Sequence, residues 1–180
     1  MSRDTSSQDQ NAPRPLEEFD RLFEPGDERL LGSLLRDLIG QACVAWRKSY
    51  GRTGSLHYGQ LVARASPPAK AVHKDHGTWV IGLWDCDRRS SRNGDVIDTR
   101  EIGDEALFQK LDQLSGAEVE DVRLDPVSLS ITIKHSNQVV LELLPDSSRG
   151  PEHEQWALEL PTGQAVIVFG NKRWAVQRNR

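Results

Sequence analysis

Apolar residues recur with a helical period in two separate parts of the chain, and each part ends at a glycine. Between residues 27 and 39, leucine and isoleucine return every three or four positions, which predicts an amphipathic helix. Gly40 follows, and glycine is favoured where a helix ends in a left-handed residue. The pattern returns over residues 104–114, where Asp104 is expected to cap the N-terminus, and Gly116 follows in the same way.

After each predicted helix the apolar period changes to two, which is the spacing of a strand with one buried face. Gly59 interrupts one alternating stretch and indicates a bulge. Asn93-Gly94 predicts a tight turn between two strands. The stretch over residues 127–134 predicts a strand with Val127 and Leu129 facing inward. The full set of expected strands is 41–48, 55–65, 78–86, 127–134, 139–144, 156–160, 165–169 and 173–176.

The order of these elements repeats along the chain. Gly40 and Gly116 are 76 residues apart, and the motifs "DHGTW" and "EHEQW" place Trp79 and Trp156 77 residues apart. We therefore expect an α+β fold, built from an internally duplicated unit of one helix followed by antiparallel strands. The two halves are expected to pack as one pseudo-symmetric domain, with these four residues as structural anchors.

This interpretation divides the chain into three parts. Residues 1–15 are polar and predict a disordered tail. Residues 16–100 form the first helix-plus-strands unit, and residues 101–180 form the second. At the start of the first unit, the apolar residues within 16–23 have helical spacing and predict a short helix.

The second half, read as "LxGxxVxxV", an alternating strand and "WxLxxPxG", resembles small uncharacterised bacterial domains of the polymorphic-toxin immunity-protein type. The resemblance covers much of residues 104–170 and extends to residues 35–85. It implies an inhibitor that binds and occludes a toxin. The first half departs from the pattern, because Trp46 and Trp84 stand where the second half has Val122 and Pro161.

The charge balance restricts the class of partner. The formal net charge is −4, so the chain has no general attraction for phosphate backbones, and nucleic acid is an unlikely partner. No apolar run approaches the roughly 18 residues that a membrane helix needs. The polar N-terminal residues have no apolar segment typical of a secretory signal. These patterns predict a cytoplasmic protein without a membrane partner.

One cluster of residue types has the chemistry of a metal site. His73 and His76 lie three positions apart with Asp75 between them, and Cys86 follows ten positions later. Imidazole and thiolate groups are typical zinc ligands. A small-molecule or metal site between the two halves, in a binding protein or an enzyme, is therefore the alternative function. The cluster does not recur in the second half of the chain. This favours the interpretation of these residues as a polar loop that binds no metal.

The sequence indicates no catalytic residue and no cofactor. Asp85 and Asp87 flank Cys86, and neighbouring carboxylates raise the pKa of a thiol and disfavour thiolate. The glycine-rich motifs that bind dinucleotides or nucleoside triphosphates do not occur in the sequence.

Trp84 near the end of the third predicted strand is followed by Arg88, Arg89 and Arg92, and tryptophan and arginine dominate the binding energy of protein interfaces. We therefore predict a non-catalytic protein-binding module, with another protein as partner and the oligomeric state left open. Its contact surface is expected on the strand faces or on a hairpin from residue 84 to residue 92. The candidate contact residues of that hairpin are Trp84, Asp85, Asp87, Arg88, Arg89 and Arg92.

Overall fold

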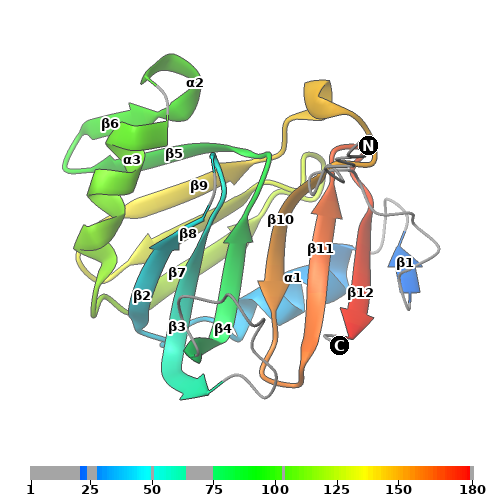
Figure 1. Cartoon of the computed structure of the whole chain (residues 1–180), viewed down its shortest axis with the longest axis horizontal. Coiled ribbons are helices and arrows are strands. Elements are labelled where there is room, and N and C mark those ends of the chain that lie inside the picture. The colour runs from blue at the N-terminus through cyan, green and yellow to red at the C-terminus, as the bar shows by residue number, and fades with distance from the viewer. Residues whose placement is uncertain (1–20, 24–27, 50, 64–74, 103, 179–180) are drawn as a thin grey trace, which may run out of the picture.

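The computed structural model describes residues 21–23, 28–49, 51–63, 75–102 and 104–178. These residues form two antiparallel sheets, one of seven strands and one of five, which pack face to face together with α-helices (Figure 1). The structure thus confirms the α+β class and the antiparallel strands. The predicted tail over residues 1–15 and the first part of the helix predicted over residues 16–23 lie outside the described residues.

The seven-stranded sheet alternates between two environments. On β10, Trp156 and Leu158 point into the core shared with the other sheet, whereas Ala157 belongs to a small apolar cluster on the opposite face. The three C-terminal strands of this sheet form the predicted meander. In order of pairing, the strands are β1 (Arg21–Phe23), β12 (Trp174–Arg178), β11 (Gln164–Phe169), β10 (Glu154–Glu159), β4 (Asp75–Leu83), β3 (Gly54–Ala63) and β2 (Cys43–Lys48).

The five-stranded sheet turns its aliphatic residues towards the same core. Ile131 pairs with Leu143, and Ile133 pairs with Leu141, so all four side chains lie on one face. In order of pairing, the strands are β6 (Asp95–Asp98), β5 (Asp87–Arg92), β9 (Val140–Leu144), β8 (Ile131–His135) and β7 (Val119–Leu124).

Each sheet takes strands from both halves of the chain. β4 pairs with β10, and β9 pairs with β5. The seven-stranded sheet therefore joins β2, β3 and β4 to the C-terminal meander, while the five-stranded sheet joins β7, β8 and β9 to the β5–β6 hairpin. Neither sequence half forms a sheet by itself, which makes the two halves one folding unit.

Each of the two longer helices buries a row of leucines in the common core. Helix α1 (Glu28–Arg36) contacts β7, and helix α3 (Asp104–Leu111) stacks Phe108 on Trp46 of β2 with ring centroids 4.9 Å apart. Two shorter helices are α2 (Thr99–Ile102) and the 3-10 helix η3 (Ser147–Arg149), and a third, η2 (Asp112–Leu114), continues α3. The leucines buried in and just after α1 are Leu31, Leu35 and Leu38. Those buried in α3 and η2 are Leu107, Leu111 and Leu114.

The segments that follow the two helices contact each other reciprocally. Gly40 donates its N–H to the carbonyl of Val119 at 2.8 Å, and Gly116 donates its N–H to the carbonyl of Cys43 at 2.7 Å. Both glycines have the expected positive φ, +84° and +78°. A second pair of backbone bonds follows the same scheme, from Cys43 N–H to Ala117 (2.8 Å) and from Val119 N–H to Gln41 (3.0 Å).

Three local predictions are wrong. Residues 21–23 form a strand rather than the end of a helix, because they pair with β12. Asp104 is the first helical residue rather than a cap, and its carboxylate accepts hydrogen bonds from Arg52 and Arg88. The strand predicted over residues 127–134 begins only at Ile131, because the preceding residues turn around the carboxylate of Asp125.

Candidate functional site

A groove of about 510 Å³ lies at one end of the five-stranded sheet. It is bounded by the tip of the β5–β6 hairpin, the turn between η2 and β7, and the turn between β8 and β9. These segments are far apart in sequence and meet because β5 pairs with β9. The residues that line it, here called the Arg92 groove, are Arg92, Gln113, Ser115, Gly116, Ala117, Ser136 and Asn137.

The turn chemistry of the sequence determines the shape of this groove. Asn93 and Gly94 both have positive φ, +52° and +91°, as a two-residue hairpin turn requires, and the turn leaves Arg92 exposed at its base. On the opposite wall, Gln138 also has a positive φ, and its N–H donates to the main-chain carbonyl of His135. Both turns directly follow the ends of strands, β5 and β8.

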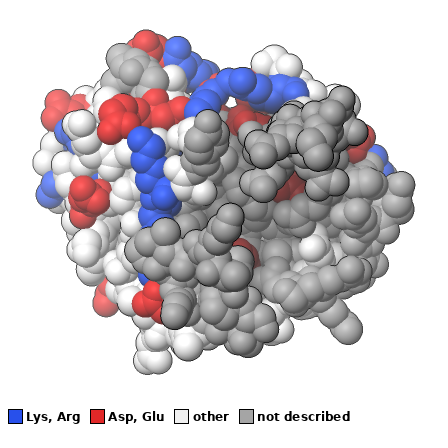
Figure 2. All heavy atoms as spheres, in the orientation of Figure 1, with Lys and Arg blue, Asp and Glu red and all other residues white. Residues whose placement is uncertain are grey.

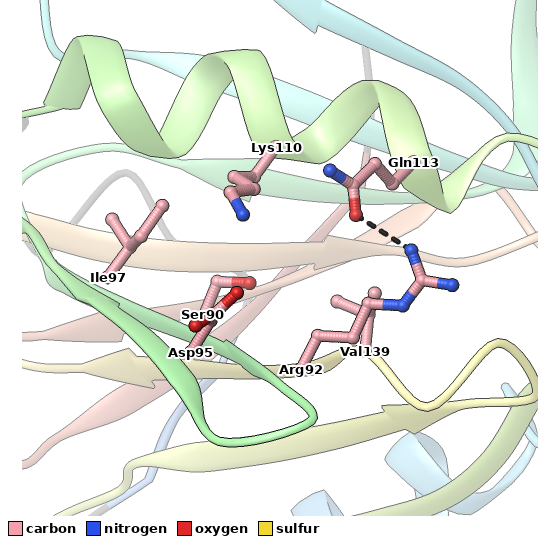
Figure 3. A pocket seen from close by; sticks show the side chains of 7 residues that line it. All are labelled: Ser90, Arg92, Asp95, Ile97, Lys110, Gln113 and Val139. Atoms are coloured by element: carbon pink, nitrogen blue, oxygen red, sulfur yellow. Dashed lines mark hydrogen bonds between the residues drawn. The ribbon is translucent and has the colours of Figure 1, made fainter.

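Hydrogen bonds connect the walls of the Arg92 groove. The Nη1 of Arg92 donates to Oε1 of Gln113 at 3.0 Å, as Figure 3 shows, and Nδ2 of Asn137 donates to the main-chain carbonyl of Gln113 at 2.5 Å. Gln113 therefore ties the hairpin tip to the β8–β9 turn. Residues from three segments are thus hydrogen-bonded to one another at the groove.

A much smaller pocket lies beside the groove, between α3 and the hairpin. Lys110 enters it from α3, opposite Ser90 and Asp95 on the hairpin (Figure 3). Its volume of about 10 Å³ is the space of one water molecule. A ligand therefore has room in the Arg92 groove and not in this pocket.

The hairpin does not present the six predicted contact residues on one surface. Arg88 is fully buried, because its register opposite Leu143 places it on the inner face of the sheet. Its guanidinium bonds to Asp104 at 2.7 Å and to the carbonyl of Trp84 at 2.7 Å. The expectation that Arg88 contacts a partner is wrong.

The other predicted contact residues are distributed over different faces. Trp84 packs on the small apolar cluster of the seven-stranded sheet, and Asp85 pairs with His153 at 3.2 Å. Strand β5, roughly 17 Å long at about 3.4 Å per residue, separates these two residues from Arg92. Asp87 pairs with Arg52 at 3.1 Å.

Arg89 lies on the outer face of the five-stranded sheet in a local ion cluster. It contacts Asp98 and Glu142, each at 3.3 Å, and Asp98 also accepts from Arg100. The Arg100 guanidinium bonded to Asp98 holds the pKa of that carboxyl far below its usual range. Of the six predicted contact residues, Arg92 alone lines the groove.

The structure does not bring the predicted metal ligands together. His73 lies outside the described residues. His76 is near the start of β4 and Cys86 follows its end, so the two are separated by roughly 23 Å of strand at about 3.3 Å per residue. Among the described residues, no group of three His, Cys, Asp or Glu side chains could hold a metal ion.

Both cysteines are buried thiols in the described structure. Burial raises the pKa of the Cys43 thiol to about 12 and also raises that of Cys86. At neutral pH both side chains are protonated and serve as small core residues, as predicted for Cys43.

A buried polar contact joins the two sheets at the centre of the molecule. The hydroxyl of Tyr58 on β3 is 3.1 Å from Nε2 of His135 on β8, and Nδ1 of His135 is 3.1 Å from the carbonyl of Val139. If Nδ1 carries the proton it donates to Val139, and Nε2 then accepts from the Tyr58 hydroxyl. Burial lowers the pKa of His135 below its usual value of 6.5.

This pKa shift predicts a loss of stability in mild acid. The unfolded chain binds a proton at His135 below about pH 6.5, whereas the folded chain resists protonation. The stability contribution is therefore complete above about pH 6.5 and is lost as the pH falls towards the lower pKa of the folded state. Urea unfolding from pH 7.5 to 5 should show a smaller loss for His135→Gln than for the natural chain. Equal losses of stability in the variant and the natural chain would contradict the assignment of this pH dependence to His135.

Comparisons with known proteins give no further assignment. No family model, no curated protein and no solved structure matches this chain. Among the helices described, the longest is α1 with nine residues, and none could cross a membrane.

Sequence reasoning missed most of the groove. Ser115, Ser136 and Asn137 are polar residues of turns and Gln113 belongs to the short helix η2, and polar residues are common in any turn. The one available signal was that each turn follows an apolar element and faces the end of the same sheet. Arg92 was predicted as a contact residue, and its position in the groove is compatible with that role.

Proposed function

We propose that this protein is a non-catalytic protein-binding module and that the Arg92 groove is its contact surface. The observation that carries the proposal is the groove itself, which is about 510 Å³ in volume and is lined mainly by exposed polar residues around one arginine. Arginine is enriched among the residues that dominate binding energy at protein interfaces. The hydrogen bonds of Gln113 link the walls of this surface, and such links reduce the side-chain ordering that binding requires.

The lining favours a macromolecular partner over a small molecule. Small-molecule sites of this volume are enclosed and mostly apolar, with a few polar groups. The Arg92 groove is open, and Ala117 is its one apolar side chain among the described residues. Figure 2 shows acidic and basic side chains interspersed on the visible face, without a large patch of one sign. The groove is therefore suited to a small area of a complementary protein surface.

An immunity-type inhibitor of a bacterial toxin is the specific version of this proposal. The support is the resemblance of residues 104–170 to small bacterial domains of that type, together with the acidic net charge of −4. Such an inhibitor acts in the cytoplasm by occluding its toxin and needs no chemistry of its own.

We also propose that the two helix-plus-strands units arose by duplication. The reciprocal backbone bonds of Gly40 and Gly116 support this interpretation, as do the buried leucines 76 positions apart. The strand pairing of β2 with β3 shifts between Cys43 and Ala45, and that of β7 with β8 shifts between Val119 and Asp121. A homologous half-length chain that dimerises through its helix–glycine–strand segment would support the duplication, and a monomeric one would contradict it.

Site-specific photo-crosslinking tests the contact surface. A benzophenone amino acid at Ser136 in the groove should crosslink one protein in the source cells, whereas the same group at Arg123 should not. Arg123 is the matched control because its side chain is 81% exposed on β7. With the partner then purified, Arg92→Glu should weaken binding roughly 30-fold, and Arg123→Glu should leave it unchanged. Equal crosslinking from both positions, or equal affinity of both variants, would overturn the proposal.

A further inference from the structure

We infer that the Arg92 groove recognises an acidic, extended peptide segment of the partner, with a carboxylate bound to Arg92. This inference rests on the proposed function, since it names the chemistry of the ligand that the groove accepts. It follows from the hydrogen-bonding groups that the groove uses internally and from those that it leaves free.

Most side-chain acceptor atoms of the groove are engaged within the protein. Oε1 of Gln113 accepts from Arg92, and the main-chain carbonyl of Gln113 accepts from Asn137. Two further side-chain acceptors are engaged by backbone donors: Oδ1 of Asn137 accepts from Val139 N–H at 3.2 Å, and Oγ of Ser136 accepts from Glu118 N–H at 3.1 Å.

The donor atoms of the groove are largely free. Within the described part of the chain, Nε and Nη2 of Arg92 have no partner, and neither does the amide nitrogen of Gln113. The hydroxyl protons of Ser115 and Ser136 and one amide proton of Asn137 are also unused by described residues. A surface whose donors are largely spare and whose side-chain acceptors are mostly occupied is complementary to a ligand that carries acceptors, above all an anion.

A carboxylate fits this arrangement better than the phosphates of a nucleic acid. The guanidinium of Arg92 binds one carboxylate through two parallel N–H groups. Arg92 is the one charged residue among those that line the groove. Nucleic-acid sites instead place several lysine or arginine side chains along the phosphate backbone. Single-stranded nucleic acid also requires aromatic stacking platforms. Of the described tryptophans, none lines the groove.

The shape of the groove suits an extended main chain. Gly116 is exposed, and a side chain added there would meet nothing within 4 Å. The floor of the groove is therefore open to close approach by a peptide backbone. The hydroxyls and amides of Ser115, Ser136 and Gln113 can donate to the carbonyls of such a backbone, while Arg92 holds an acidic side chain.

Peptide titration of the full chain tests the inference without the natural partner. The probe is acetyl-Gly-Glu-Gly-Glu-Gly-amide, and its uncharged counterpart has Gln in place of Glu. In nitrogen-15 NMR spectra, the Glu peptide should shift the side-chain amide signals of Gln113 and Asn137 and the backbone signals of residues 115–117. Arg92→Gln should weaken this binding at least roughly tenfold, the loss expected for a charge-assisted bidentate pair.

Two controls separate the possible outcomes. Arg123→Gln removes another exposed arginine, on β7, and should leave the titration unchanged. Equal shifts with the Gln peptide, shifts confined to other residues, or tighter binding of oligothymidylate at the same signals would each overturn the inference. A crosslinked partner that requires Arg92 but binds without an acidic residue would contradict the inference alone and leave the proposed function standing.

Discussion

Replacing Trp156 with alanine is expected to lower the free energy of unfolding by about 3–5 kcal/mol. Trp156 is fully buried between the sheets, and its indole N–H donates to the carbonyl of Leu129 at 3.0 Å. The substitution creates a large cavity and leaves that carbonyl without its donor. Leu129 itself is buried with a φ of +56°, which is strained for a leucine and depends on such contacts. Urea unfolding followed by circular dichroism measures the loss.

Trp79→Ala provides the comparison, because Trp79 ends the motif "DHGTW" as Trp156 ends the similar motif "EHEQW". It is half-buried and packs against the edge of the core, so its removal should cost about 1–2 kcal/mol. Trp156→Phe keeps most of the apolar volume and isolates the cost of the lost hydrogen bond. If Trp79→Ala and Trp156→Ala cost the same, the two tryptophans are equal anchors, as the repeat alone predicts.

Short-range features of the fold could be predicted from the sequence. The bulge expected at Gly59 is present, since the pairing of β3 with β4 shifts between Tyr58 and Leu61 and Gly59 has a φ of +80°. The Asn93-Gly94 turn and the C-terminal meander are also present. These features depend on the backbone preferences of a few adjacent residues, and such preferences can be read locally.

Strand pairing between distant segments could not be predicted in this way. The motif "DHGTW" begins strand β4, and "EHEQW" leads into strand β10, its neighbour in the same sheet. β4 is the third strand after α1, whereas the third strand after α3 is β9. By order in the chain, the motif in β10 therefore does not correspond to that in β4. Only non-local contacts decide which strands pair, and alternation in the sequence does not encode them.

The candidate site illustrates the same limit. The alternation of β5 places Arg88 and Ser90 inward and leaves Arg89 on the other face. The sequence of this strand is polar throughout, so it does not indicate which of the two faces is buried. A buried arginine is uncommon without a paired acid, and its partner Asp104 lies sixteen positions away on a different element. The groove, likewise, needs three turns to meet at one sheet end.

Arg88→Ala is expected to lower the free energy of unfolding by about 3–5 kcal/mol, the range for removing one partner of a buried ion pair. The guanidinium of Arg88 connects the β5–β6 hairpin to α3 through Asp104. It also donates hydrogen bonds to the main-chain carbonyls of Arg52 and Trp84. Without it those two carbonyls lose a donor, while Asp104 retains the Nε of Arg52 at 2.7 Å.

The neighbouring arginine is the matched control for this variant. Arg89→Ala removes the same side chain from a position that is 38% exposed. Its buried partner Asp98 keeps the guanidinium of Arg100, so the cost should be below about 1 kcal/mol. Arg88→Met fills the buried volume without charge and should recover part of the loss, since packing and not charge alone is removed in the alanine variant. If Arg88→Ala costs no more than Arg89→Ala in urea unfolding, the hairpin is held to α3 by apolar packing, and the buried ion pair contributes nothing to that junction.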